Sequence, residues 1–423
     1  MVFVLHLMKI LLKNATFIDP KSAFHFSSKD ILIQDGIISV IDDEIIDDEA
    51  KIISYSNLHI SRGWFDSSVC FGEPGYEERE TLKNGLKTAG LSGFSQIALN
   101  PNNNPITDNQ TAVGYLKNAS SKSATQIYPI ASFSKNQEGN QLTELYDLKQ
   151  NGAIAFGDFK KPIENTELFK IALLYTQRFK GLIISHPSDS SLGNNGGVNE
   201  GVVSTKNGML GSPALSEVLQ VQRDIAVLEY TGGHLHIPYL SCYQSLELIR
   251  KAKKKGLKIS CSVALANLLF TEDQLNDFDT SFKLEPPLRT ETDRTALRQG
   301  VIDGTIDLVT SNHEPLNIEL KHLEFEYAAT GTLGLEAMFG VLSTLFPTEK
   351  VISILTKGKN IFNIENSPME VGQKANITLF NPNGNDIFKE EHIISTSKNC
   401  AFIDFPTLGI VYGVINNAQT ILK

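Results

Sequence analysis

Residues 234–261, HLHIPYLSCYQSLELIRKAKKKGLKISC, contain a complete strand–helix–strand unit. The short apolar runs 234–237 and 258–261 have the length of strands, and residues 243–255 between them have the length of a helix. The basic run 250–256 ends in a glycine, which is typical of a helix C-terminus, so we assign it to helix capping and not to nucleic-acid binding. A unit of this kind places two parallel strands side by side in one sheet.

The same rhythm of short apolar strands and helix-length segments continues over most of the chain. Residues 216–230 have the length of another helix, and further strand candidates are 65–69, 96–99, 127–130, 153–156, 182–185 and 308–310. Together with the two strands above, these make the eight strands of a closed barrel. The sequence therefore predicts an α/β fold, a (β/α)8 barrel of the TIM type.

Both ends of the chain have a β pattern instead. Strand candidates near the N-terminus are 10–12 and 15–18, followed by a hairpin over 31–40 whose Asp35-Gly36 pair suits a type I′ turn. Strand patterns return at 375–380 and 413–422. We predict one small β-domain built from residues 1–60 and 369–423, beside a barrel formed by residues 61–368.

Composition narrows the classes of function. The 423 residues are 41% hydrophobic and 20% charged, as in ordinary soluble proteins, and the net charge of −10 argues against a nucleic-acid surface. The acidic runs 42–44 and 47–49 are expected to form a solvated face. No segment approaches 18 consecutive apolar residues, so we expect no membrane span.

The cysteines and the N-terminus suggest a location. Four cysteines without a CxxC pair fit a reducing cytoplasm. Residues 1–12 are apolar but lack a cationic start and a small-residue cleavage site, so we expect no signal peptide. Met1 and Met8 are both candidate start residues.

Residues 66–75, DSSVCFGEPG, carry a resemblance to a known family. The stretch resembles the first barrel strand and loop of the dihydroorotases, members of the cyclic amidohydrolases, whose pattern is Asp-x-His-x-His-Phe-Arg-Glu-Pro-Gly. Motifs similar to those of the longer, carbamoyltransferase-associated dihydroorotases follow in order, at 93–108, 152–160, 185–189, 209–217, 236–241, 286–293, 311–316, 331–336 and 371–376. The resemblance covers nearly the whole chain and implies the same fold.

The resemblance also implies a chemistry. Dihydroorotases use zinc to activate water and polarise a cyclic amide, and an aspartate moves the proton. At the family's metal-ligand and proton-shuttle positions this chain has Ser68, Cys70, Asp158, His186, Tyr239 and Asn312. Only Asp158 and His186 retain the family's residue type, and Asn312 cannot accept a proton as a carboxylate does. We therefore expect no metal ion, no other cofactor and no confident catalytic residue.

The substrate positions depart in the same way. Gly72 stands where the family has its carboxylate-binding arginine, and Glu285 stands where it has asparagine. Leu316 replaces a histidine, and Asn102 alone is retained. The structural interpretation of Asp158, His186 and His313 is that they are hydrogen-bonded residues of the scaffold.

Three hypotheses follow. The first is an inactive dihydroorotase homologue of pyrimidine biosynthesis that serves as a structural or assembly partner of aspartate carbamoyltransferase and forms a homo-oligomer, a dimer. The second is an active cyclic amidohydrolase with a mononuclear zinc site made of Cys70, Asp158, His186 and Asp189. The third is a metabolite sensor that uses the vacated pocket around Asn102 and Tyr239.

Overall fold

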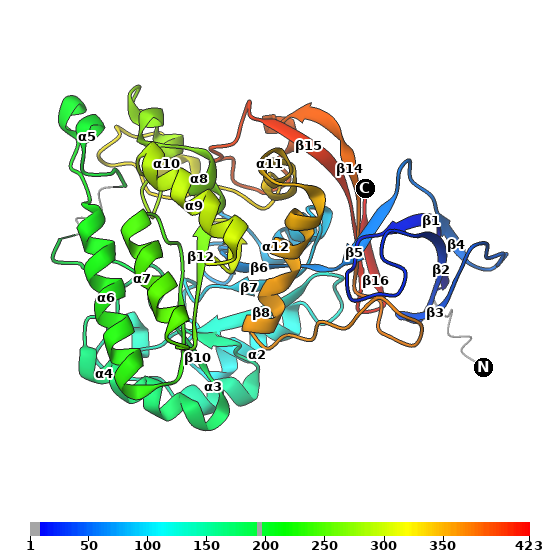
Figure 1. Cartoon of the computed structure of the whole chain (residues 1–423), viewed down its shortest axis with the longest axis horizontal. Helices are drawn as coiled ribbons and strands as arrows, with labels where there is room; N and C mark the ends of the chain where they lie inside the picture. Colours follow the sequence, from blue (N-terminus) through cyan, green and yellow to red (C-terminus); the bar gives the residue numbers. More distant parts are fainter. Residues whose placement is uncertain (1–8, 193–196) are drawn as a thin grey trace.

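The computed structural model describes residues 9–192 and 197–423, so the candidate starts Met1 and Met8 lie outside the described residues. Its larger part is a parallel sheet surrounded by helices (Figure 1). The strands of this sheet are β6 (Trp64–Val69), β7 (Phe94–Leu99), β8 (Gln126–Ala131), β9 (Ala155–Phe156), β10 (Leu182–Ile184), β11 (His234–Ile237), β12 (Ile259–Ala264) and β13 (Leu308–Thr310).

The parallel strands form a TIM-type barrel, as the sequence predicts. They follow one another in chain order from β6 to β13, and a parallel bridge between Val69 and His313 joins the two ends of the sheet. The interior holds a layer of apolar side chains that includes Phe65, Ile130 and Leu308. A packed interior leaves the carboxyl ends of the strands as the place for a site.

Helices follow the strands and cover the barrel. They are α1 (Leu82–Leu91), α2 (Gln110–Ala119), α3 (Leu145–Asn151), α4 (Thr166–Thr176), α5 (Val202–Asn207), α6 (Ala214–Thr231), α7 (Tyr243–Lys254), α8 (Leu265–Leu269), α9 (Glu291–Asp303), α10 (Ile318–Lys321), α11 (Met338–Leu345) and α12 (Thr348–Ile361). The basic run ends α7 as predicted, because Lys255 is its C-cap and Gly256 follows with a φ of +79°.

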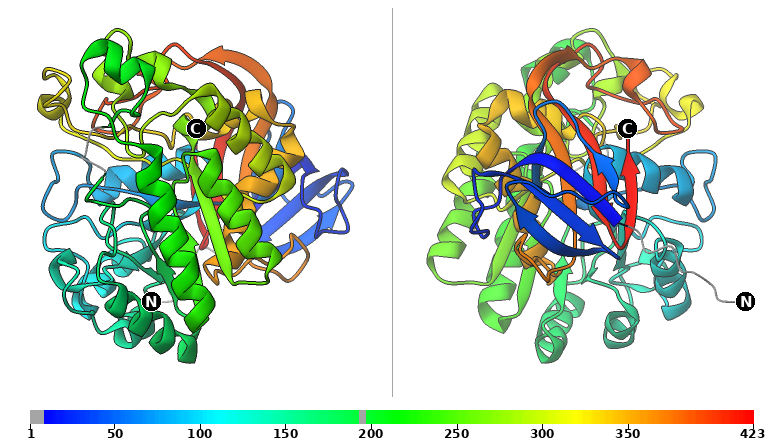
Figure 2. Two further views of the ribbon diagram at one scale, coloured as in Figure 1. Left: turned by 60° about the vertical axis from the view of Figure 1, so that its left-hand side comes forward. Right: turned by 90° about the vertical axis from the view of Figure 1, so that its right-hand side faces the viewer.

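A second sheet combines the two ends of the chain, also as predicted. Its strands are β1 (Lys9–Phe17), β2 (Ser28–Gln34), β3 (Ile37–Asp42), β4 (Lys51–Ile53), β5 (His59–Arg62), β14 (Ile377–Ile387), β15 (Pro406–Asn416) and β16 (Gln419–Leu422). The N-terminal and C-terminal strands lie side by side (Figure 2), and the antiparallel pair of β5 with β14 joins the two halves.

Two local predictions for this sheet have different outcomes. Asp35 and Gly36 both have positive φ, 51° and 77°, as the type I′ turn requires. The prediction of two strands at 10–12 and 15–18 is wrong, since residues 9–17 form the single strand β1. Its pairing with β2 shifts register between Leu12 and Ala15, so a bulge lies where the sequence suggests a break.

The barrel and the second sheet meet at the start of β6. Gly63 joins β5 to β6, and a Cβ on it would lie 1.8 Å from Asn376 Oδ1 and 2.1 Å from Ser95 Oγ, so a larger residue would have to displace both side chains. Trp64 is fully buried and stacks on Phe339 with ring centroids 4.9 Å apart, and its ring also lies 5.7 Å from that of Phe380. One aromatic cluster therefore belongs to both parts of the molecule.

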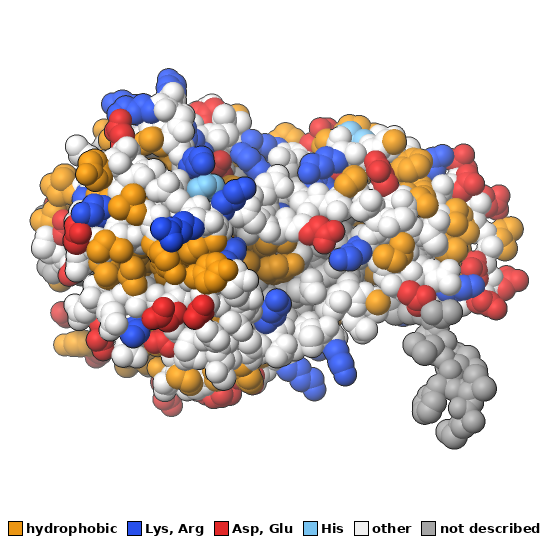
Figure 3. Space-filling model, turned by 90° about the horizontal axis from the view of Figure 1, so that it is seen from below, with side chains coloured by type: hydrophobic (Ala, Val, Ile, Leu, Met, Phe, Trp, Pro, Cys, Tyr) orange, Lys and Arg blue, Asp and Glu red, His pale blue; other side chains and the backbone are white. Residues whose placement is uncertain are grey.

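The surface differs between the two parts. Figure 3 shows acidic side chains gathered at the end of the second sheet and a band of hydrophobic side chains across the barrel. The predicted acidic runs at 42–44 and 47–49 are exposed or partly exposed, as expected for a solvated face. No helix within the described residues is both long and apolar enough to span a membrane.

Candidate functional site

The sequence-predicted site residues come together at one end of the barrel. Ser68 lies in β6, while Asp158, His186, Tyr239 and Asn312 lie just after β9, β10, β11 and β13. These are the carboxyl ends of the strands, where active sites of this barrel lie. The position of the site therefore agrees with the sequence pattern, and its chemistry depends on how these side chains are used.

Three of the family's metal-ligand positions are joined by hydrogen bonds. The hydroxyls of Ser68 and Tyr239 share one, and Asn100 Nδ2 donates to Ser68 Oγ at 2.8 Å and to Cys70 Sγ at 3.5 Å. Burial raises the pKa of the Tyr239 phenol and of the Cys70 thiol, so both hold their protons at neutral pH. A zinc ion at these positions would have to displace these protons and break the hydrogen bonds between the side chains.

Asp158 is turned into the loop that follows β8. Its carboxylate accepts hydrogen bonds from Ser132 Oγ at 2.6 Å, from Ser134 N at 3.1 Å and from Ser134 Oγ. Both oxygens of the carboxylate are used in these bonds, which tie one loop to the next strand. The geometry fits a residue of the scaffold.

His186 faces an acid where the family pattern has asparagine. Its Nε2 lies 3.4 Å from Glu285 Oε1, and its buried Nδ1 has no partner within the described residues. Burial alone would raise the pKa of Glu285, but the hydrogen bond and charge of His186, with the charge of Lys160, hold that pKa below its ordinary value. Glu285 is therefore a carboxylate that pairs with Nε2 of His186.

Lys160 and Glu314 form an ion pair that the sequence reasoning missed. The side chains are 9% and 16% exposed, and Lys160 Nζ donates to Glu314 Oε2. Burial alone would lower the pKa of Lys160, but the charges of Glu314 and Glu285 raise it above its ordinary value. The sequence did contain a sign of this pair. Lys160 stands where the family motif at 152–160 has glycine, and Glu314 stands where the motif at 311–316 has alanine. An internal ammonium thus supplies positive charge at this end of the barrel.

The remaining polar residues of the motifs have structural surroundings. Asn312 donates from Nδ2 to the carbonyl of Glu285 at 3.0 Å. His313 is fully buried, which lowers its pKa, and its Nδ1 accepts from the amide of Gly334 at 3.3 Å. His236 lies between two serine hydroxyls, and burial lowers its pKa to about 4. Both histidines are therefore neutral near pH 7.

Gly72 cannot be replaced by a larger residue in this loop. A Cβ at this position would lie 1.7 Å from the carbonyl oxygen of Tyr76, whose amide in turn donates to Gly72 O at 3.0 Å. The arginine of the family pattern would therefore require a different path for the loop. Asn102, the retained substrate-type residue, has a buried Oδ1 without a partner within the described residues.

Other retained motif residues hold the fold together. Glu217 accepts from the amide of Ser241 at 3.1 Å, next to the start of α7. Arg289 donates to Ser241 Oγ at 3.1 Å and to Asn199 Oδ1 at 2.8 Å. These buried contacts join helix α6 to three loops at this end of the barrel, so these residues have a structural role that does not depend on catalysis.

Little space is left among the side chains at the family's ligand positions. A cavity of about 20 Å³ lies among Ser68, Lys160, His186 and Tyr239, and an adjoining one of about 40 Å³ lies beside Glu285. The first has room for about one water molecule. Cavities that bind small molecules are usually about 300–1,000 Å³. A ring-shaped substrate would need these side chains to move.

The donor set does not fit the zinc ion that the family resemblance implies. Within residues 9–192 and 197–423, no group of three or more His, Cys, Asp or Glu side chains is placed to hold a metal ion. The four residues of the rearranged zinc site, Cys70, Asp158, His186 and Asp189, are therefore not gathered in one cluster. Asp189 instead accepts from the amide of Ser191 at 2.9 Å.

The cysteines allow a direct check of this chemistry. All four are buried, and burial raises the pKa of each thiol. We expect the native protein at pH 8 to show almost no reaction with the thiol reagent DTNB, whereas the urea-unfolded protein reacts at four cysteines per chain. Fast reaction of Cys70 in the native protein, lost in Cys70→Ser, would contradict this description of the site.

Known proteins similar to this chain agree with the fold and the motifs. Residues 59–245 match the family model described as dihydro-orotase-like. The chain is 35% identical over 413 residues to a dihydroorotase of Syntrophus aciditrophicus, covering 96% of this chain and 97% of that protein. It is 34% identical to a dihydroorotase of Acetivibrio thermocellus, covering 98% of this chain and 99% of that protein.

Solved structures support the architecture. The L-hydantoinase (dihydropyrimidinase) from Arthrobacter aurescens superposes with a TM-score of 0.83 at 18% identity, covering 98% of this chain and 96% of that one. The dihydropyrimidinase from Brevibacillus agri gives a TM-score of 0.81 at 18% identity, covering 98% and 95%. At this identity the likeness concerns the fold, whereas the dihydroorotases share a third of their residues over the whole length. The chain belongs to the dihydroorotase-like family of amidohydrolases.

Proposed function

We propose that this protein is a dihydroorotase homologue of pyrimidine biosynthesis that lacks dihydroorotase activity. The observation that carries the proposal is the ion pair of Lys160 with Glu314 at the carboxyl end of the barrel. The Lys160 ammonium supplies positive charge in the cavity that Ser68 and Tyr239 also line, and these two residues stand at metal-ligand positions of the family. Burial raises the pKa of the Tyr239 phenol. A lysine ammonium provides charge but, unlike a zinc ion, it is no Lewis acid that could activate water.

Zinc content and turnover test this proposal together. We expect the purified native protein to carry far less than one zinc ion per chain by mass spectrometry. We also expect no turnover of carbamoyl aspartate or dihydroorotate, with or without added zinc. The dihydroorotase of Syntrophus aciditrophicus, prepared and assayed in parallel, is the positive control. Stoichiometric zinc together with turnover would refute the proposal.

Retained activity is the second candidate, and one observation favours it. The sequence similarity to proteins named dihydroorotase, 35% and 34% identity, extends over nearly the whole chain. In that case Cys70, Asp158, His186 and Asp189 would have to rearrange around one zinc ion. Cys70→Ala separates the two candidates, because it removes bound zinc and activity only if the thiolate is a ligand.

The role that we propose in place of catalysis is to support the assembly of aspartate carbamoyltransferase, with this chain as a homodimer. Large apolar side chains on α4 and α6 are at least 40% exposed, namely Ile171, Leu174, Tyr175, Leu215, Leu219 and Tyr230. Helices α4 and α6 are neighbours, so these side chains provide an apolar surface of the kind that protein interfaces use.

Light scattering after size exclusion tests the assembly role. We expect a dimer alone and a larger complex when the carbamoyltransferase of the same organism is added. Leu174→Glu and Leu219→Glu, on the exposed surface of α4 and α6, should weaken assembly, whereas Lys170→Glu on α4 serves as a polar-surface control. A monomer that never associates with the carbamoyltransferase would refute this role.

A further inference from the structure

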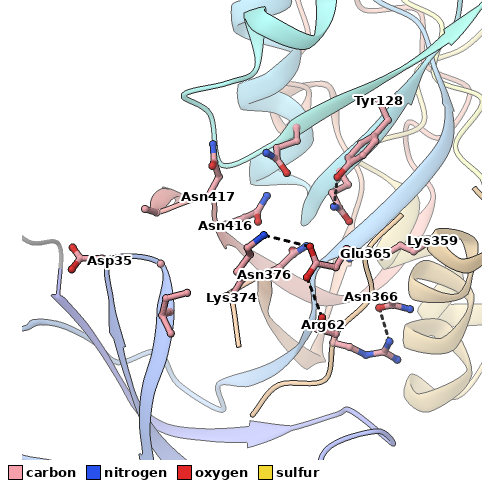
Figure 4. Close-up of a pocket in the computed structure, with 16 residues that line it drawn as sticks. Asp35, Arg62, Tyr128, Lys359, Glu365, Asn366, Lys374, Asn376, Asn416 and Asn417 are labelled. Atoms are coloured by element: carbon pink, nitrogen blue, oxygen red, sulfur yellow. Dashed lines mark hydrogen bonds and ion pairs between the residues drawn. The ribbon is translucent and has the colours of Figure 1, made fainter. Parts of the chain in front are cut away.

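A cavity larger than these two lies at the other end of the barrel. It has a volume of about 300 Å³ and lies between the second sheet and the first halves of β7 and β8 (Figure 4). Nearly all of its lining side chains are polar, among them Arg62, Gln96, Tyr128, Lys359 and Asn376. Nothing in the site described above uses this cavity, which has the size expected for a small ligand.

Lys359 on α12 is the unexplained residue of this cavity. The residue is 1% exposed, and its ammonium makes no hydrogen bond or ion pair with the described residues. Burial, and next the charge of Arg62, lower the pKa of Lys359 to about 7, against the opposing charges of Asp19 and Glu365. A buried ammonium without a counter-ion is unfavourable, so the cavity has an unmet requirement for one negative charge.

The acids near the cavity already have cationic partners. Asp19 pairs with Arg62 Nε at 2.9 Å, and Glu365 pairs with Lys374 Nζ at 3.5 Å. Asp35 lies in an exposed turn, on the far side of the cavity from Lys359 (Figure 4). Once these pairs are formed, no further acid in the described part of the chain pairs with Lys359.

Gln96 and Tyr128 add a second unmet requirement. Gln96 Nε2 donates to the Tyr128 hydroxyl at 2.9 Å, while the buried Gln96 Oε1 has no partner within the described residues. Since Tyr128 accepts from Gln96, its own proton is free to be donated, and burial raises the pKa of this hydroxyl. The cavity therefore offers an ammonium and a hydroxyl as donors, and the Gln96 amide oxygen becomes an acceptor once its buried side chain turns toward the cavity.

We propose that this cavity binds a small carboxylic acid that also carries a hydroxyl or N–H group, with the carboxylate on Lys359 and the donor group on Gln96. One carboxylate supplies the single negative charge that the surroundings of Lys359 lack. A donor group satisfies the free amide oxygen of Gln96. The cavity lies across the barrel from the dihydroorotase-type site, so this inference does not depend on the proposed function.

Thermal unfolding with a hydroxy acid as probe tests the inference. We expect sodium lactate to raise the melting temperature in a saturable way, compared with sodium chloride at equal ionic strength, because a ligand of the folded state stabilises it. Lys359→Met should raise the half-saturating lactate concentration at least about tenfold. Lys357→Met is the matched control on the same helix, where the side chain is 45% exposed, and it should respond like the wild type.

Two further arms make the test sharper. Gln96→Leu should weaken the lactate response and reduce the advantage of lactate over acetate, which lacks the hydroxyl. Raising the pH from 6 to 9 should weaken binding, because Lys359 loses its proton over this range. Equal responses of Lys359→Met and Lys357→Met, or no response beyond chloride, would overturn the inference. A stronger response to phosphate than to lactate would overturn the assignment to a carboxylate.

Discussion

Replacing Lys160 by methionine is expected to lower the free energy of unfolding by about 3 kcal/mol, because Glu314 then stays buried without its counter-ion. The Glu314 side chain is 16% exposed, so water cannot fully replace the lost ammonium. Urea denaturation followed by circular dichroism measures the loss. Lys161→Met is the matched control, since that neighbouring lysine is exposed, and it should change the stability by less than about 0.5 kcal/mol.

The double variant Lys160→Met with Glu314→Leu identifies the cause. Replacing both members of a buried ion pair by apolar residues is often neutral or stabilising, so most of the lost stability should return. The coupling between the two changes would then be at least about 1 kcal/mol. If the two changes simply add, the pair is not what stabilises this end of the barrel.

Trp64→Ala is expected to have the largest effect of all, a loss of about 4 kcal/mol in the free energy of unfolding. The side chain is fully buried and its ring contacts Phe339 and Phe380, so the substitution opens a cavity between the barrel and the second sheet. Trp64 is the only tryptophan, so circular dichroism must replace intrinsic tryptophan fluorescence in the urea titration.

A conservative change provides the control for this prediction. Trp64→Phe keeps an aromatic ring and loses the hydrogen bond from Nε1 to Ser61 Oγ, so it should cost clearly less than Trp64→Ala. If Trp64→Ala unfolds at the wild-type urea concentration, the aromatic cluster does not couple the two parts of the molecule.

Much of the fold could be predicted because the barrel strands are short, buried and bounded by turns. The predicted bounds of β11 and β13 agree with the structure at both ends. Where a strand contains a bulge, as β1 does near Ala15, the local pattern suggests two elements instead of one. Only the pairing with β2 shows that residues 9–17 form one continuous strand, and this pairing belongs to the tertiary structure.

The sequence could place the candidate residues at the strand ends, but it could not predict which contacts their side chains make. The motifs place Asp158 at a strand end, yet the hydrogen bonds from two serines of the previous loop decide how its carboxylate is used. Likewise, the partners Lys160 and Glu314 are 154 residues apart in the chain. No local pattern links residues so far apart. The pair can be recognised only in the folded barrel, where the loops after β9 and β13 meet.

The shared sheet at the chain ends has a consequence for biosynthesis. A nascent polypeptide leaving the ribosome presents β5 hundreds of residues before β14, its neighbour in the finished sheet, has been translated. Until then, the edge of β5 and the apolar face around Ile60 stay open to wrong pairing. Chaperone dependence of expression should therefore rise sharply in chains that stop before residue 377, even though every barrel strand is already present.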